Sequence, residues 1–420
     1  MASQVHDRRR FLAFVLLAAA CKPAPAEPAR PQAVLVSPEA RADAPTWVAG
    51  GDAFAIELYQ RVRAREGNQF FAPGNLRSAL AMTYAGAAGT TAQEMARALH
   101  FESLPGPRLH AAQAAAAADL GTADSGVGGV VLRAANRLWG AQGEPFVPAY
   151  LELTRTQYGA ELVGIDFAAT EHARQTINAW VSQQTQAKIP ELLAAPDIDA
   201  ATRLVLTSAI YFKGAWLRAF DPAQTLDRPF QVPGLAVPPA VPTMQQKAEF
   251  FKYAEPEGVQ VLELPYVGDR LAMLIVLPRA ADGLPALEAE LSPARVAGWV
   301  AALRSRKVQV ALPRFTTRAR FELSGVLAAM GMPTAFTGAA NFSEMSRAGG
   351  LSISSVVHEA FIDVGEAGTE AAAATAVVMT RSMPIGAPPA FTADRPFLYF
   401  IRDTRSGQLL FVGRVVDPRG

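Results

Sequence analysis

The sequence predicts an α+β fold, with helices dominating the N-terminal part and strands the remainder. Two observations carry this prediction. Apolar residues recur with helical spacing in segments such as 52–63, and runs of strand length such as 204–212 are almost wholly apolar. Strands and helices do not alternate regularly and no internal repeat occurs, which argues against repeated βαβ units. With 420 residues, half of them hydrophobic, the chain is long enough for one large core or two or three ordinary domains.

The helices follow from apolar periodicity and from the residues that interrupt it. Phe54, Ile56 and Leu58 recur among polar residues in the first helical segment. The break at 70–73 and Gly89 separate the next two helices, and a glycine-rich turn is expected at 121–129. In chain order, the predicted helices are 52–63, 76–88, 91–99, 111–120, 150–158, 177–185, 284–290, 293–304 and 321–330.

The strands are short apolar runs bounded by turn residues. Many prolines interrupt the stretch from 213 to 251, so we expect irregular structure there. The last two strands form a hairpin around Arg405-Ser406-Gly407. In chain order, the predicted strands are 130–139, 204–212, 259–265, 272–277, 308–313, 397–401 and 409–415, with His358 on a further buried strand.

The stretch Gly365–Met383, GEAGTEAAAATAVVMTRSM, fits two structures equally well. It is an Ala-rich surface helix if Thr369 acts as an N-cap. As a strand, it places Thr369, Ala371, Ala373, Thr375, Val377 and Met379 on one face. That face contains no charge and no proline, as a segment that alternates between exposed loop and central strand requires.

Net charge and cysteine content exclude several classes of function. The formal charge of +1 gives no reason to expect nucleic acid or an acidic membrane surface as a partner. The single cysteine excludes an internal disulfide framework and any site built from several cysteines. We therefore expect no metal and no cofactor.

Residues 1–21 are interpreted as an export signal. Asp7-Arg8-Arg9-Arg10 precedes a short apolar run that ends at Cys21 and is too short to cross a membrane. The run LLAAAC resembles a bacterial lipoprotein signal, in which Cys21 becomes the lipidated first residue, and RRRFL resembles a twin-arginine signal. The alternative is an ordinary cleaved signal. Residues 22–46, rich in Pro and Ala, are predicted to tether a folded body that begins near Trp47. These features predict an exported cell-envelope lipoprotein, or a periplasmic or extracellular protein.

Enzyme motifs are absent from the sequence. It contains no G-x-S-x-G, S-x-x-K, H-E-x-x-H, P-loop or G-x-G-x-x-G. The five histidines show no metal-ligand spacing, and His358 in VVHEAF is interpreted as a buried core residue. We therefore do not expect an enzyme.

Six motifs are spread along the chain from about Trp47 to Pro418. In chain order they are NQFFAPGNLRSALAMTYAGAAGTTAQEM, INAWVSQQTQAKIPELL, LTSAIYFKGAW, VALPRFTTRARFEL, ISSVVHEAFIDVGEAGTEAAAATAV and ADRPFLYFIRDTRSGQLLFVGRVVDP. They resemble motifs of the serpin family, the first its N-terminal helix-pair motif and the second its long-helix motif, and they follow in the family's order. Six such matches in order make the resemblance specific.

The resemblance implies one serpin domain over 47–420, with three β-sheets, eight or nine helices and an exposed reactive loop over about 366–391. It also implies a suicide-substrate inhibitor of serine, or cysteine, endopeptidases. The protease forms an acyl-enzyme on the loop, and the cut loop then inserts into the main sheet as a new central strand. This requires a metastable uncut state. A monomer is implied, with a membrane contacted only through the lipid anchor.

The resemblance assigns a hinge and a polar cluster that governs sheet opening. The hinge consists of Glu366, Gly368, Thr369, Glu370, Ala371, Ala372, Ala373, Ala374 and Thr375. Its small residues fit between strands, whereas an unpaired charge or a proline would block entry. We expect residues 369–379 to be exposed before cleavage.

The sheet-opening cluster would contain Ala72, Asn75, Ser208 and His358, with Trp216 at the point where insertion starts. The family usually has Ser at positions 72 and 75 and Asn at 208. Either Asn75 supplies the amide that position 208 lacks, or the cluster has drifted.

The scissile bond has two candidates. Counting seventeen positions from Glu366 ends at Ser382, which predicts cleavage at Ser382-Met383 by an elastase-like or subtilisin-like protease. A hinge one residue shorter predicts cleavage at Arg381-Ser382 by a trypsin-like protease, because arginine needs a carboxylate in the specificity pocket. We favour Ser382. The alternative functions are a non-inhibitory serpin acting as a carrier or chaperone, and an anchored binding module.

Overall fold

Nine α-helices form among the residues that the structure describes. The computed structural model describes residues 36–122, 129–369 and 387–420, and Val34–Gly420 make one compact unit. The helices are α1 (Pro38–Val62), α2 (Pro73–Tyr84), α3 (Gly89–Ala98), α4 (Pro107–Gly121), α5 (Pro148–Tyr158), α6 (Thr170–Gln184), α7 (Leu284–Ala289), α8 (Pro293–Ala302) and α9 (Ser324–Ala329). Five of them begin with proline, whose fixed φ and missing N–H suit the first helical position.

The main sheet has six strands in the described part of the chain, in the spatial order β10-β11-β12-β4-β2-β3. They are β2 (Val130–Ala141), β3 (Leu162–Ile165), β4 (Leu204–Ala215), β10 (Phe315–Glu322), β11 (Ser355–Gly365) and β12 (Gly368–Thr369). β4 lies within this sheet and is buried along nearly its whole length, which explains why its sequence is almost continuously apolar. Helix α2 packs on one face of β4, and α6 packs on the other.

The remaining nine strands follow the path β1-β15-β14-β8-β7-β6-β9-β13, with β5 paired to β6. They are β1 (Gln69–Phe71), β5 (Leu226–Pro229), β6 (Ala240–Ala254), β7 (Val259–Pro265), β8 (Leu271–Pro278), β9 (Arg304–Pro313), β13 (Ala390–Thr392), β14 (Phe397–Asp403) and β15 (Leu409–Val415). Strand β6 pairs with β9 along most of its length but with β7 only at residues 252–254. This short contact joins two sheets into one hydrogen-bonded path, so the expected three sheets are connected as two.

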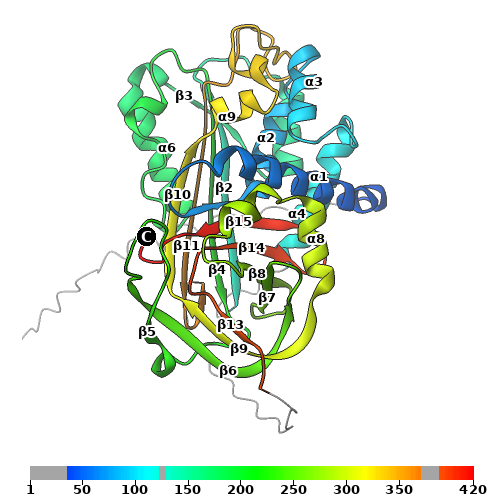
Figure 1. The fold of residues 1–420 in the computed structure, drawn as a ribbon. Coiled ribbons are helices and arrows are strands. Elements are labelled where there is room, and N and C mark those ends of the chain that lie inside the picture. The colour runs from blue at the N-terminus through cyan, green and yellow to red at the C-terminus, as the bar shows by residue number, and fades with distance from the viewer. Residues whose placement is uncertain (1–35, 123–128, 370–386) are drawn as a thin grey trace, which may run out of the picture. The chain divides into compact units, whose positions relative to one another are not determined.

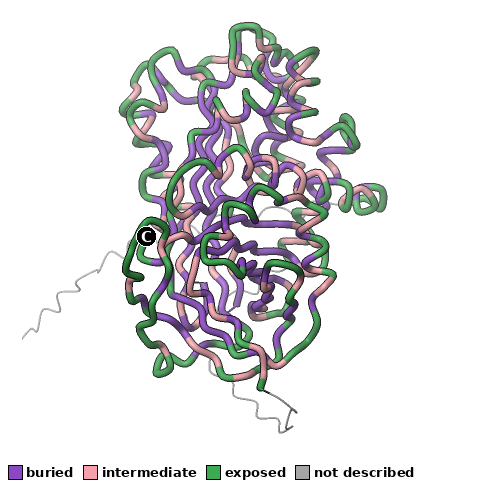
Figure 2. The backbone as a smooth tube through the Cα atoms, in the orientation of Figure 1, coloured by how far each residue is buried: buried purple, intermediate pink, exposed green. Residues whose placement is uncertain are grey.

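The buried residues lie between these layers. Figure 2 shows the strands at the centre as buried and the helix surfaces and connecting loops as largely exposed. One hydrophobic cluster joins α1 and α2 to the face of the main sheet that α2 covers. A second cluster fills the space between the main sheet and strands β7, β8, β14 and β15. A third lies under α6. The predicted α+β class is therefore confirmed.

Three local predictions were wrong. The folded body begins at Pro38 rather than Trp47, because Ser37 accepts a hydrogen bond from the Ala40 N–H at 3.2 Å and caps α1. Residues 38–46, assigned to the tether, are therefore helical. The expected helix 321–330 is shorter than predicted, because Phe321 and Glu322 are the last residues of strand β10 and α9 begins only at Ser324. The stretch 213–251 contains most of the long strand β6, in which Pro242 occupies an exposed position of an alternating pattern.

Candidate functional site

The candidate site lies where β12 separates β4 from β11. These two strands pair directly and in parallel over 205–211 and 355–361. Beyond that region, Thr369 pairs with Gly214 on one side and with Val364 on the other. Gly368 and Thr369 of the predicted hinge are therefore already a two-residue strand inside the main sheet, whose neighbouring strands β4 and β11 are labelled in Figure 1.

Thr369 is fully buried, which corrects the expectation that it is exposed before cleavage. Its Oγ1 lies 2.9 Å from the Tyr266 hydroxyl. The Tyr266 ring stacks on Trp216 with centroids 4.6 Å apart. The Trp216 indole N–H donates to the Gly365 carbonyl at 3.0 Å, and its backbone N–H donates to the Ala367 carbonyl at 2.9 Å. Trp216 thus contacts the residues that lead into β12. Tyr266 was missed because nothing in its local sequence links it to a segment a hundred residues away.

Gly368 is required where β12 enters the sheet. Its φ is +143°, a region that side chains with a Cβ rarely adopt. A Cβ at this position would lie 2.1 Å from the Gly214 carbonyl oxygen. The glycine therefore allows β12 to approach β4 closely enough to pair with it.

Glu366 connects the hinge to two neighbouring elements. Arg314, which follows β9, donates from Nε to its Oε1 at 2.7 Å, and the Thr225 hydroxyl donates to the same oxygen at 2.5 Å. Burial opposes ionisation, but these hydrogen bonds hold the pKa of Glu366 below its ordinary value. Glu366 is therefore a charged residue that ties the chain just before β12 to Thr225 and Arg314.

The four residues of the predicted sheet-opening cluster lie together. The Ala72 N–H donates to His358 Nε2 at 3.0 Å, and His358 Nδ1 lies 2.8 Å from the Ser208 carbonyl oxygen. A backbone N–H can only donate, so Nε2 is the unprotonated nitrogen and Nδ1 carries the proton. Burial lowers the pKa of His358 to about 4. Ala72 therefore takes part in the cluster through its main-chain N–H.

Asn75 bridges the cluster. Its Nδ2 donates to Ser208 Oγ at 3.0 Å, which favours the exchange of Asn and Ser between positions 75 and 208 over simple drift. The Asn136 amide in turn donates to Asn75 Oδ1 at 2.7 Å. Sequence reasoning missed Asn136, which shares with Ser208 a register position on the paired strands β2 and β4.

Other predicted site residues lie outside the described ranges. These are Cys21, the hinge residues Glu370, Ala371, Ala372, Ala373, Ala374 and Thr375, and the candidate reactive residues Arg381, Ser382 and Met383. The glycine-rich turn also falls mostly outside them. At its far end, the expected exposed loop 366–391 overlaps β13, where Phe391 is buried.

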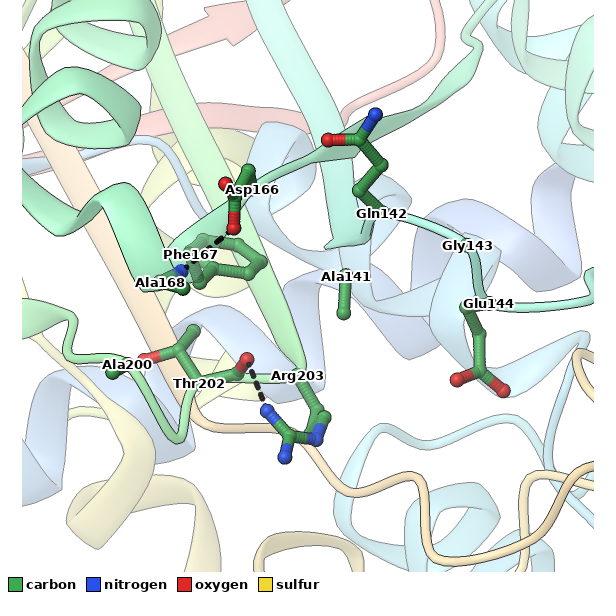
Figure 3. A pocket seen from close by; sticks show the side chains of 10 residues that line it. All are labelled: Ala141, Gln142, Gly143, Glu144, Asp166, Phe167, Ala168, Ala200, Thr202 and Arg203. Carbon is green, nitrogen blue, oxygen red and sulfur yellow. Dashed lines mark hydrogen bonds between the residues drawn. The ribbon is translucent and has the colours of Figure 1, made fainter.

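A further cavity lies away from the hinge. A cavity of about 320 Å³ lies at the ends of β2 and β3 and the start of β4. In it, Asp166 accepts from the Ala168 N–H at 2.9 Å, and Arg203 donates to the Thr202 carbonyl at 3.2 Å (Figure 3). Asp166 and Arg203 are therefore hydrogen-bonded to backbone groups of their own loops. Within 36–122, 129–369 and 387–420, no three metal-ligating side chains come together and no helix is long and apolar enough to cross a membrane.

Comparisons with known proteins agree with this geometry. The family described as Serpin (serine protease inhibitor) matches residues 49–418. A leukocyte elastase inhibitor from Bos taurus is 41% identical over 375 residues, covering 87% of this chain and 97% of that protein. A serpin-like protein from Thermococcus kodakarensis is 38% identical, covering 88% and 85%.

Solved structures match as closely in fold. Uncleaved ovalbumin superimposes with a TM-score of 0.79 at 30% identity, over 89% of this chain and all of that chain. Human thyroxine-binding globulin in complex with its ligand gives a TM-score of 0.80 at 28% identity, over 89% and 99%.

Proposed function

This chain belongs to the serpin family of serine protease inhibitors, and we propose that it traps its target endopeptidase as a suicide substrate. The serine hydroxyl of the protease attacks the scissile carbonyl carbon of the loop. An ester bond forms and the peptide bond breaks, releasing the new amine. The N-terminal part of the cut loop then inserts between β4 and β11 and carries the bound protease with it. The chain itself acts as substrate and trap, not as an enzyme.

The position of β12 carries this proposal. It already pairs on both sides, so insertion extends an existing strand rather than nucleating a new one. Continuing its register along β4 and β11 would place Thr375 between Ser208 and His358. The threonine hydroxyl would then offer hydrogen bonds to the cluster that the parting strands disrupt. At about 3.3 Å per residue, eleven inserted residues would span roughly 36 Å, matching the length of β11 (Ser355–Gly365).

The test is to block insertion at Thr369. In Thr369→Arg, an unpaired charge would enter a fully buried site, at a cost of several kcal/mol. We expect the chain to be cut by proteases without forming an SDS-stable complex. Thr369→Val is the matched control, because it keeps the volume and loses only the contact with Tyr266, and it should still trap. A Thr369→Arg variant that trapped protease with the stoichiometry of the native chain would contradict the mechanism.

We place the reactive bond at Ser382-Met383, with Arg381-Ser382 as the alternative. The first implies an elastase-like or subtilisin-like target and the second a trypsin-like one. The leukocyte elastase inhibitors among the relatives support the first choice. Mass spectrometry of the C-terminal peptide released by elastase and by trypsin distinguishes the two bonds.

A non-inhibitory carrier is the second candidate function. The similarity to thyroxine-binding globulin, solved with bound thyroxine, favours it. A carrier would form no covalent complex with any protease, and cleavage of its loop would raise its thermal stability little. Differential scanning calorimetry before and after cleavage separates the two functions.

We further propose that the chain is exported as a monomer and anchored through a lipid on Cys21. The basic start, the short apolar run and the cysteine support this. Residues 22–37 would then form a tether that ends where α1 begins. Radioactive palmitate should label the native chain but not Cys21→Ser, and sedimentation should give the mass of one chain. A soluble mature form starting at another residue would contradict the anchor.

A further inference from the structure

The loop between β5 and β6 exposes a continuous apolar surface. Residues 233–238, PGLAVP, are all exposed, and Leu235 and Val237 are 48% and 79% exposed. Six large hydrophobic residues are exposed in the described part of the chain, and three of them lie within 226–237. Single exposed apolar residues are ordinary, but a contiguous run indicates an interaction surface. We call residues 233–238 the apolar loop.

The apolar loop is held in one conformation. The Leu235 N–H donates to the Val232 carbonyl at 3.2 Å, and Gly234 has φ +82°. With proline at 233, these features define a type II turn. The Phe230 N–H donates to the Pro239 carbonyl at 2.9 Å and closes the loop at its base. A loop ordered in advance loses little conformational entropy on binding.

The segment 225–231, which comes just before the apolar loop, contacts the chain on both sides of residues 370–386. Thr225 bonds to Glu366, close before residue 370. The Gln231 N–H donates to the Asp394 carbonyl at 2.7 Å, close after residue 386. The six steps along the chain from residue 225 to residue 231 span at most about 20 Å. Figure 1 shows β5, β6, β9 and β13 at one end of the folded unit.

We propose that the apolar loop is a second contact surface for the target endopeptidase. This inference rests on the proposed function, which places the protease on residues 370–386. A protease domain of about 200 residues has a radius of gyration near 17 Å and a width of about 40 Å. It is wider than the roughly 20 Å spanned by 225–231, so it extends over the neighbouring loop. Residues 232–239 carry no charge, so the matching surface of the protease is an apolar patch beside its active-site cleft.

The experiment compares the full chain with a variant that carries both Leu235→Ser and Val237→Ser. For elastase, subtilisin and trypsin, the rate of cleavage between residues 370 and 386 is measured in the full chain and in a free peptide of the same residues. The ratio of the two rates shows how much the rest of the chain contributes to recognition by each protease. For the protease with the highest ratio of chain to peptide cleavage, we expect the double variant to lower the chain rate about tenfold, equivalent to about 1.4 kcal/mol. Leu151→Ser, an exposed leucine on α5, is the matched control and should leave the rate unchanged.

The cleavage rate reports docking of the protease, and the SDS-stable complex reports trapping, so the same reactions test the two separately. A tenfold slower cut supports the contact surface even where no SDS-stable complex forms, an outcome that would refute the inhibitory mechanism alone. An unchanged rate with complexes still forming overturns the contact surface and leaves the proposed function standing. An unchanged rate combined with loss of a dimer, or loss of binding to phospholipid vesicles, also overturns it and assigns the apolar loop to a second copy or to a lipid surface.

Discussion

Lowering the pH perturbs two neighbouring residues of β11 in opposite directions. His358 points into the sheet-opening cluster, where burial lowers its pKa to about 4. Glu359 points to the other face, with its Oε1 3.7 Å from Arg318 Nη1. Burial there outweighs the nearby arginines and raises the pKa of Glu359 to about 7. The two side chains therefore titrate in the same pH range with opposite consequences for stability.

The sign follows from which state binds more protons. Between pH 6.5 and 4 the unfolded chain protonates His358 while the native chain holds it neutral, because burial disfavours the charged imidazolium. The Ala72 N–H donates to Nε2 in this neutral form. Stability from His358 is therefore complete above pH 6.5 and falls as the pH drops toward 4, by about 3 kcal/mol for a shift of this size. Glu359 behaves oppositely: the native chain takes up its proton first, so stability rises as the pH falls from 7 toward 4.5. In the native chain the two effects largely cancel.

Variants separate the two effects. In His358→Gln, a side-chain amide replaces the imidazole without titrating, so its unfolding free energy should rise relative to that of the native chain by about 3 kcal/mol between pH 6.5 and 4. Glu359→Gln should shift the opposite way. The assay is urea unfolding at half-unit pH steps, with unfolding rates recorded wherever refolding is incomplete. Comparing variants with the native chain removes the background from other titrating groups. If the difference between the native chain and His358→Gln stays constant across this range, His358 is not held neutral and the reasoning is refuted.

Three further predictions concern the same region. Asn75→Ser and Ser208→Asn should each destabilise the chain by about 1–2 kcal/mol, whereas the double variant should recover most of the loss, as urea unfolding would measure; additive losses would exclude the exchange. Glu366→Gln removes a charge-assisted pair and should cost about 1 kcal/mol, seen as a lower unfolding midpoint. High salt should lower the midpoint of this variant less than it lowers the midpoint of the native chain. Gly368→Ala should expel β12 from the sheet and expose Trp216, seen as red-shifted fluorescence; an unchanged spectrum would contradict the role of the glycine.

The fold class was predictable because hydrophobic periodicity is a local property. Strands such as 204–212 and 397–401 are recognisable from their own residues. The long β6 was missed, since Pro242 and the prolines before the strand suggested irregular structure while its pairing with β9 stabilises it. The split of 321–330 was missed as well, because β10 depends on pairing with β11. Pairing between distant segments overrides local preference in both cases.

The candidate site was predictable in its residues but not in its contacts. Ala72, Asn75, Ser208 and His358 were expected together because motifs in a familiar order carry them. Which atoms meet could not be read from the chain, since Ala72 and His358 are 286 positions apart. Tyr266 and Asn136 carry no local signal that links them to the site.

The sequence by itself determined what the hinge is made of: small, uncharged residues at alternate positions that a sheet can accept. Only the tertiary structure decided where the start of the hinge lies, with Thr369 already buried between β4 and β11. Composition limits which states a segment can adopt. The state it occupies depends on the tertiary contacts that each state makes, here those of Thr369 with Tyr266 and those of Trp216 with the chain before β12.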